Sequence, residues 1–195
     1  MLRATAVVIA LVCPKIGPVC PREAPASVSI AVTWNGLIHE STAAALVTPQ
    51  DGLSVWEGGR LYTYTRVHVE QAIAGDLPQG DAWVRTMGGV VGNVGQLVDG
   101  EAVLAPGQRS LLFLKAGPVG AFDVTARGQG QFVVTASQVS APARLSRSRS
   151  VGMLLPPLPT NAGAPAALAA EVVDGRLVDD VARAVAAGWG ALHAH

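Results

Sequence analysis

The clearest pattern in the sequence is a strict alternation of side-chain types over residues 61–70. Odd-numbered positions carry Leu, Thr or Val, whereas even-numbered positions carry large polar or aromatic side chains. A period of two is typical of a strand that buries one face, and it favours an antiparallel sheet. The predicted inward positions are Leu61, Thr63, Thr65, Val67 and Val69, and the predicted outward positions are Tyr62, Tyr64, Arg66, His68 and Glu70.

Short apolar runs separated by turn residues predict further strands on both sides of this one. Residues 43–48 form the first run, which is expected to end at Pro49 and the Asp51-Gly52 turn. Residues 82–87 form the next strand, and the apolar run 110–115 is typical of a buried central strand. Hairpins are predicted for 96–98 with 101–104 across Asp99-Gly100, and for 122–127 with 131–135. The chain is therefore expected to be mainly β, as an antiparallel barrel or sandwich over residues 27–136.

Two helices are predicted outside the strands. Residues 34–41 favour a short helix with Asn35 as its cap. Residues 177–193 favour an amphipathic C-terminal helix within the segment 166–195, because Leu177, Val181, Val185 and Leu192 repeat at helical spacing. The Ser-, Arg- and Pro-rich residues 137–165 are expected to form a linker.

The first residues of the chain predict export. Arg3 precedes an apolar run over residues 4–12, and Ala24-Pro25-Ala26 has the small-x-small pattern of a cleavage site. Residues 1–26 are therefore expected to be a signal peptide and the protein to be secreted or periplasmic, with no transmembrane segment in the mature chain. The alternative is a buried N-terminal strand. Both cysteines lie in the predicted leader, so the mature chain would contain neither a disulfide nor a thiol.

Composition and charge narrow the function classes. The chain has 22 glycines, 13 prolines and only 14% charged residues, which suits many short strands joined by tight turns. Fourteen basic and fourteen acidic residues cancel, so nucleic acid is not the expected partner.

No familiar catalytic or cofactor motif stands out. The glycines between Gly88 and Gly95 lack the Lys-Ser/Thr ending of a phosphate loop, and are expected to supply positive φ angles at a tight corner. His68 and Glu70 share a strand face, but nothing points to a third ligand, so no metal site is predicted. The sequence predicts no catalytic residue and no cofactor.

The order of several segments resembles known proteins. The segments are Gly59-Arg-Leu-Tyr-Thr-Tyr-Thr-Arg-Val-His-Val, Ile73-Ala-Gly75, Trp83-Val-Arg-Thr, Gly88-Gly89 and Gly107-Gln-Arg-Ser-Leu-Leu-Phe-Leu114. Together they cover about half the chain and resemble a group of small secreted bacterial proteins of unknown function. More distantly, they are similar to the OB-type barrel of netrin-like modules and tissue inhibitors of metalloproteinases, with Ala74-Gly75 in place of a Lys-Gly turn.

The resemblance implies export and an antiparallel OB-like or netrin-like β-barrel with a C-terminal helix. Inhibitors of that class chelate the zinc of their target through an N-terminal cysteine, which the predicted mature chain lacks. No inhibitory residue is therefore carried over, and fold alone does not fix function.

The remaining candidate site is an exposed aromatic and basic strand face. Rings beside guanidinium groups suit sugar rings or the side chains of a protein partner. We expect a non-catalytic binding module for a protein or a glycan, unless these side chains only pack across strands or lie under the C-terminal helix. Two alternatives are a structural subunit of a surface assembly that oligomerises through that helix, and a hydrolase of extracellular polymers with unidentified carboxylates. The candidate binding residues are Tyr62, Tyr64, Arg66, His68, Trp83 and Arg85.

Overall fold

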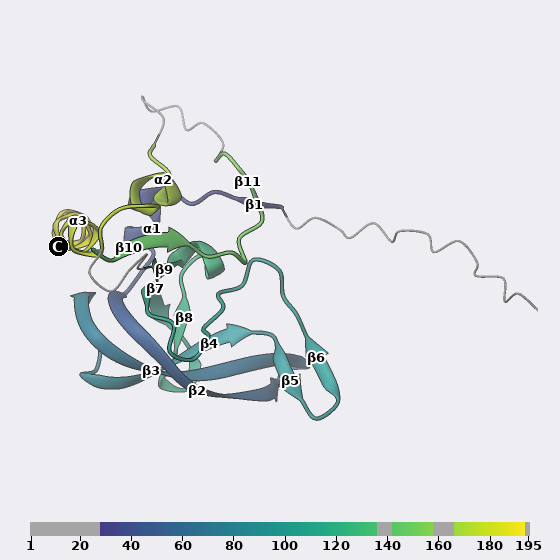
Figure 1. Ribbon diagram of the computed structural model, residues 1–195. Coiled ribbons are helices and arrows are strands. Elements are labelled where there is room, and N and C mark those ends of the chain that lie inside the picture. The colour runs from purple at the N-terminus through teal and green to yellow at the C-terminus, as the bar shows by residue number, and fades with distance from the viewer. Residues whose placement is uncertain (1–27, 136–141, 158–165, 194–195) are drawn as a thin grey trace, which may run out of the picture.

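The computed structural model describes residues 28–135, 142–157 and 166–193, and it is mainly β with a C-terminal helix (Figure 1). Its strands are β1 (Val28–Ile30), β2 (Ala43–Glu57), β3 (Arg60–Gly75), β4 (Gly80–Met87), β5 (Gly89–Val91), β6 (Val94–Gln96), β7 (Ser110–Ala116), β8 (Phe122–Val124), β9 (Gln131–Thr135), β10 (Arg144–Arg147) and β11 (Met153–Leu155). Its helices are α1 (Trp34–His39), α2 (Ala169–Val173) and α3 (Val178–Leu192), with short 3₁₀ helices η1 (Pro118–Gly120) and η2 (Arg127–Gly130).

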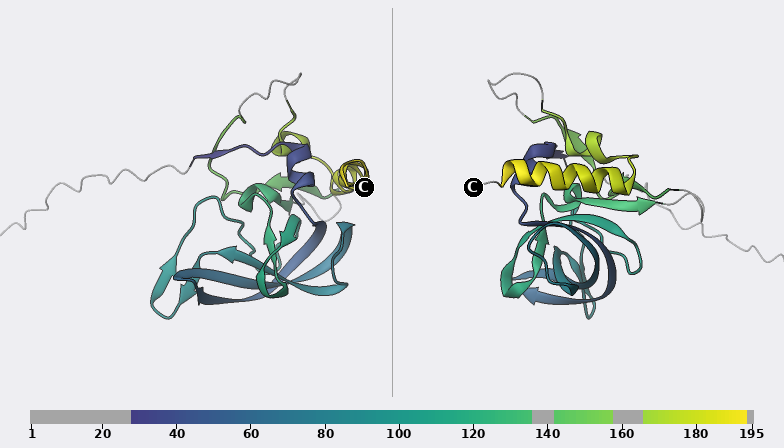
Figure 2. Two further views of the ribbon diagram at one scale, coloured as in Figure 1. Left: turned by 180° about the vertical axis from the view of Figure 1, so that it is seen from behind. Right: turned by 90° about the vertical axis from the view of Figure 1, so that its left-hand side faces the viewer.

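Seven strands form one sheet in the order β10-β9-β7-β2-β3-β4-β8. β8 also pairs back to β7, so that β7, β2, β3, β4 and β8 close a ring of hydrogen-bonded strands. The pair β4–β8 is parallel, which departs from the expected antiparallel pattern. Figure 2 shows this curled sheet with α3 lying across one end of it.

The strands β2 and β7 are apolar along their paired parts, except at Ser110, because both of their faces are covered. Inside the ring lies a core of mostly small side chains, including Ala43, Ala45 and Val47 of β2 with Leu112 and Leu114 of β7. The alternate residues of the same strands face the helices instead.

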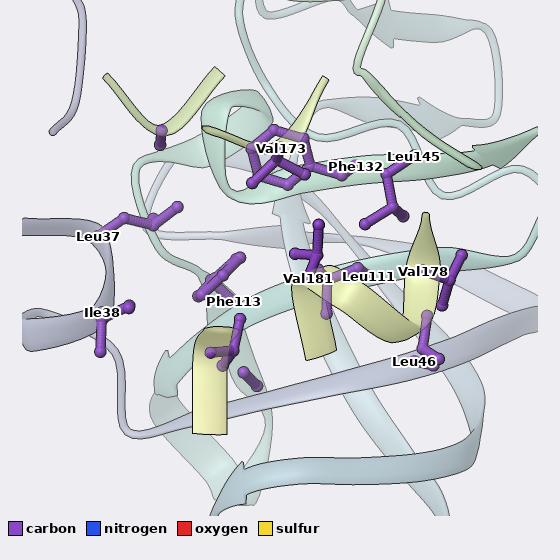
Figure 3. Packing of buried hydrophobic residues seen from close by; sticks show 13 residues of the cluster. Leu37, Ile38, Leu46, Leu111, Phe113, Phe132, Leu145, Val173, Val178 and Val181 are labelled. Atoms are coloured by element: carbon purple, nitrogen blue, oxygen red, sulfur yellow. The ribbon is translucent and has the colours of Figure 1, made fainter. Parts of the chain in front are cut away.

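A second core joins the sheet to the helices (Figure 3). Phe113 of β7 makes edge-to-face contacts with Trp34 of α1 and with Phe132 of β9. Val178, Val181 and Val185 of α3 are buried in this cluster, so the apolar stripe of the C-terminal helix is covered by the protein's own chain. The amphipathic C-terminal helix predicted from the sequence is confirmed.

The first strand was predicted too short. β2 continues through Pro49 and Gly52, where its register against β3 shifts and forms a bulge instead of a turn. β2 pairs with β7 only as far as Val47, so the missing N–H of Pro49 costs no ladder bond to β7. The short helix α1 is confirmed, but its cap is Thr33, whose hydroxyl accepts a hydrogen bond from the amide of Gly36, and not Asn35.

Both predicted hairpins were wrong. The chain between Gly89 and Gln96 forms the hairpin β5–β6 instead, and residues 101–104 form no strand. β8 pairs with β7 and β4, and β9 pairs with β7 and β10, because η2 separates them. The prediction that the glycine cluster supplies positive φ angles is confirmed at Gly88, Gly89 and Gly92.

The segment expected to be a linker contains regular structure where it is described. Arg144–Arg147 form β10 at the edge of the main sheet, and Met153–Leu155 form β11, which pairs in parallel with β1. The predicted signal peptide, residues 1–26, lies outside the described residues. Within the described residues, no helix is both long and apolar enough to cross a membrane.

Candidate functional site

The candidate residues lie together on the outside of the sheet, on one face of β2, β3 and β4. Tyr64 is opposite Leu53 on one side and Arg85 on the other, and Arg66 is opposite Trp83. Paired residues in a sheet point to the same side, so these side chains share a surface. We call this surface the outer strand face and define it by Leu53, Tyr62, Tyr64, Arg66, His68, Trp83 and Arg85.

The predicted alternation of β3 explains this placement. Leu61, Thr65 and Val67 are buried on the inner side, whereas Arg66 is partly exposed and His68 is exposed on the outer side. The period weakens beyond Glu70, because the register of β3 against β2 shifts there and Gln71 and Ala72 are both exposed.

At one end of the face, Arg85 organises a cluster of four side chains. Its guanidinium donates two hydrogen bonds to Asp123, of 2.9 and 3.1 Å, and one of 2.7 Å to Glu57. Its Cζ lies 4.5 Å from the centre of the Tyr62 ring, within the range of a cation–π contact. The Tyr64 hydroxyl donates a 2.8 Å hydrogen bond to the second oxygen of Glu57.

A second, more exposed cluster surrounds Arg66. Its Nε donates to Asp51 at 2.8 Å, and its Nη1 donates to Asp81 at 3.2 Å. The other oxygen of Asp81 lies 3.1 Å from Nδ1 of His68. Arg66 and Asp81 therefore hold each other in fixed orientations while both remain open to solvent.

The pKa shifts follow these contacts. The hydrogen bonds of Asp123 raise the pKa of Arg85, so that this side chain is a fixed positive charge. Partial burial, aided by the hydrogen bond to Glu57, raises the pKa of Tyr64, which keeps its hydroxyl protonated. The hydrogen bond from Arg66 lowers the pKa of Asp51, which keeps that carboxylate ionised.

The outer strand face is not covered by the rest of the described chain. Trp83 is 44% exposed and Leu53 is 65% exposed. The helix α3, which could have covered the tyrosines, packs instead against α1 and the distant end of β3, where Ile73 and Ala74 join its core. The tyrosines themselves are only half-buried, because Arg85 and Glu57 occupy part of their surroundings.

A pocket of about 180 Å³ adjoins the face at Tyr62 and Arg85. It extends toward β7 and η2, and Glu101 lies buried at its wall. Burial raises the pKa of Glu101, although its carboxylate accepts hydrogen bonds from backbone amides and lies 3.9 Å from Arg127. The pocket is lined by Tyr62, Arg85, Met87, Glu101, Lys115, Asp123, Val124 and Arg127.

Sequence reasoning found the cationic and aromatic residues of the face but missed their acidic partners. Asp123 is 38 positions from Arg85, and Glu57 is 28 positions from it, so only the fold brings them together. Asp51 and Asp81 were also missed, because Asp51 was assigned to a turn with Gly52 and Asp81 lies just before the predicted strand 82–87. The strand register of Asp81 opposite His68 is the one signal that could have identified it.

Metal ligation has no support in the described part of the chain, where no three His, Cys, Asp or Glu side chains are grouped to hold an ion. The carboxylates of the face are instead engaged by arginines. The outer strand face presents directional hydrogen-bonding groups beside aromatic rings, a combination that suits noncovalent recognition of a ligand.

No protein-family model matches the sequence, and neither the curated proteins nor the solved structures compared with it show a significant match. The resemblance to netrin-like modules therefore stays an expectation.

Proposed function

We propose that the protein is a secreted, non-catalytic binding module that recognises a glycan through its outer strand face. In this proposal the closed ring of β7, β2, β3, β4 and β8 is an OB-like or netrin-like barrel, and export follows from the leader pattern in residues 1–26. The observation that carries the proposal is the exposed indole of Trp83 beside carboxylates that arginines hold in place.

The charge on the face favours a glycan over a protein partner. Protein interfaces are depleted of charged residues at their centre, and removing ion pairs from water is costly. Here Arg66, Arg85, Asp51, Asp81 and Glu57 stand among the aromatic rings. Sugar hydroxyls can replace the water around such groups, because a paired carboxylate keeps free lone pairs that accept hydrogen bonds.

The ring of Trp83 supplies the complementary contact. It belongs to β4 opposite Arg66, so the exposed indole shares a surface with charged side chains that could bind hydroxyls. A pyranose ring has one apolar face and a polar edge, and this combination matches an indole flanked by charged side chains.

The alternatives fit the structure less well. A subunit that assembles through its C-terminal helix needs an uncovered apolar stripe, but Val181 and Val185 are buried within the monomer. A hydrolase could use Glu101 and Asp123, which line one pocket. Asp123, however, is engaged by Arg85 through both oxygens, and Glu101 accepts hydrogen bonds from backbone amides. These contacts favour binding over catalysis.

Affinity electrophoresis against a panel of soluble polysaccharides tests the proposal. The wild-type protein should be retarded by at least one of them, and Trp83→Ala should weaken that binding about tenfold, as expected for about 1.4 kcal/mol of lost stacking. Trp56→Ala is the matched control. Trp56 is 54% exposed on β2 but lies opposite Leu61, on the other side of the sheet from the outer strand face.

The control should bind as the wild type does. Equal binding by Trp83→Ala and the wild type would overturn the assignment of the face, and a wild-type protein that binds none of the polysaccharides would overturn the glycan as ligand. A purified protein that binds with micromolar affinity, and loses that affinity in Trp83→Ala, would indicate that the ligand is a protein and not a glycan.

A further inference from the structure

The pocket beside Tyr62 is lined by more cationic than acidic side chains. Three cationic side chains line it, Arg85, Lys115 and Arg127, against two acidic ones, Asp123 and Glu101. Arg85 is balanced by Asp123 and by Glu57, and it is mostly buried, with its side chain 14% exposed. Lys115 and Arg127 are exposed and present their charges to the pocket from two different elements.

Lys115 makes no ion pair within the part of the chain that the structure describes, and Arg127 has only the 3.9 Å contact with Glu101. Because burial raises the pKa of Glu101, that contact is weakened whenever Glu101 gains a proton. Among the described residues, the pocket therefore offers two cations, Lys115 and Arg127, neither of which has an ion pair closer than 3.9 Å.

The backbone at Arg127 is held in a conformation that non-glycine residues rarely adopt. Ala126 and Arg127 have φ angles of 53° and 55°, in the left-handed region, which costs of order 1 kcal/mol for each residue. Two hydrogen bonds fix the turn, from the Gly128 amide to Gly100 O at 2.9 Å and from the Gln129 amide to Ala126 O at 3.2 Å.

This turn places the side chain of Arg127 on the pocket wall with Glu101. Strained backbone of this kind persists where the surrounding structure fixes it, and it is frequent at ligand sites. The strained backbone at Ala126 and Arg127 is an observation separate from the charges of the lining residues, and it points to the same pocket.

We propose that this pocket binds the carboxylate of an acidic sugar residue, a uronate, through Lys115 and Arg127. The inference rests on the proposed function, because Tyr62 belongs both to the pocket and to the outer strand face. A glycan that lies on the face can therefore place one residue in the pocket without leaving the sheet. The volume of about 180 Å³ accommodates a single sugar residue or its carboxylate end.

An NMR titration of the full chain with sodium glucuronate tests the pocket directly, with methyl glucoside as the neutral counterpart. Glucuronate should shift the amide resonances of residues 115 and 127, and methyl glucoside should not. Lys115→Gln and Arg127→Gln should each weaken glucuronate binding about tenfold, which corresponds to one lost charge-assisted hydrogen bond. Arg183→Gln is the matched control, since it removes one positive charge from the exposed side of α3.

The two proposals fail in different ways. Trp83→Ala should bind polysaccharide about tenfold more weakly but keep its glucuronate binding, because Trp83 does not line the pocket. Absence of shifts with glucuronate, or equal shifts with methyl glucoside, would overturn the pocket proposal and leave the face intact. If Arg183→Gln weakened glucuronate binding as much as Lys115→Gln and Arg127→Gln do, the pocket proposal would also be overturned, because the anion would then respond only to the net charge of the protein.

Discussion

Arg85 and Asp123 are joined by two hydrogen bonds, of 2.9 and 3.1 Å, across the neighbouring strands β4 and β8. This pair stands where β8 closes the ring of strands, and the same guanidinium lies over Tyr62 on the outer strand face. One ion pair thus links the closure of the sheet to the geometry of the candidate site.

Asp123→Asn should therefore lower the free energy of unfolding by about 1–3 kcal/mol, because the mostly buried Arg85 loses a charge-assisted, bidentate partner. Chemical denaturation monitored by circular dichroism measures this loss. Asp51→Asn is the control, since Asp51 pairs with Arg66 at a solvent-exposed position and should scarcely alter stability. Equal stability of Asp123→Asn and the wild type would show that the pair does not hold β8 in place.

Glu101 should make stability depend on pH. Its pKa in the folded protein is raised above the ordinary value of 4.5 by burial, so the folded protein binds this proton more tightly than the unfolded chain does. The protonated Glu101 therefore stabilises the folded protein. This contribution is complete below the pKa that Glu101 has in the unfolded chain, and it is lost as the pH rises through its pKa in the folded protein. Glu101→Gln, which resembles the protonated form, should thus gain stability relative to the wild type as the pH rises above 4.5.

Thermal unfolding of both proteins over a series of pH values from 4.5 upward measures the difference in Tm. A constant difference would mean that Glu101 has the same pKa folded and unfolded. A difference that shrinks as pH rises would contradict the direction of the shift.

Gly89 and Gly58 offer a matched pair for the backbone. Both have positive φ, of 134° and 56°, but a Cβ at Gly89 would collide with the hydroxyls of Ser54 and Thr63, whereas nothing lies within 4 Å of one at Gly58. Gly58→Ala should cost about 1 kcal/mol, from backbone strain alone. Gly89→Ala should cost several times more, since it also disturbs the hydrogen bond between Ser54 and Thr63.

Urea denaturation of the two variants provides the comparison. Equal losses would show that the start of β5 can move away from the sheet without cost, and would remove the constraint that we assign to Gly89.

The sequence predicts most reliably the elements whose burial pattern is uniform. The alternation through Tyr62 and Val67 locates β3 because only one of its faces is buried along that stretch. The run around Leu112 locates β7 because both of its faces are covered. The stripe through Val181 and Val185 locates α3 for the corresponding reason at helical spacing.

Elements could not be predicted in this way where the turn or strand propensity of the residues differs from the structure that they adopt in the fold. Asp51 and Gly52 favour a turn, but pairing with β3 continues past them and absorbs them as a bulge. Asp99 and Gly100 do form a turn, in which the Glu101 amide donates a 3.3 Å hydrogen bond to Val98 O, but residues 101–104 form no strand after it, and Gly100 O accepts a hydrogen bond from the distant Gly128 amide. Long-range pairing therefore outweighs the local turn propensity at Asp51, whereas at Asp99 the turn forms without the expected hairpin.

The candidate site likewise has a part that the sequence predicts and a part that it does not. Tyr62, Tyr64, Arg66 and His68 come from one strand, so its period places them together. The pocket beside them combines β3, β4, β7, β8 and η2 with Glu101, and no local pattern connects segments so far apart.

The most direct measurement of the central claim uses the four tryptophan side chains as reporters. Trp83 lies on the outer strand face, Trp56 is exposed on the opposite side, Trp34 packs on Phe113, and Trp189 stacks on His193. The four indole N–H resonances can be followed while a polysaccharide retained in affinity electrophoresis is added. We predict that the Trp83 resonance shifts in proportion to binding while the other three stay in place. Saturable binding that leaves the Trp83 resonance unmoved would contradict the proposal that the outer strand face is the glycan site.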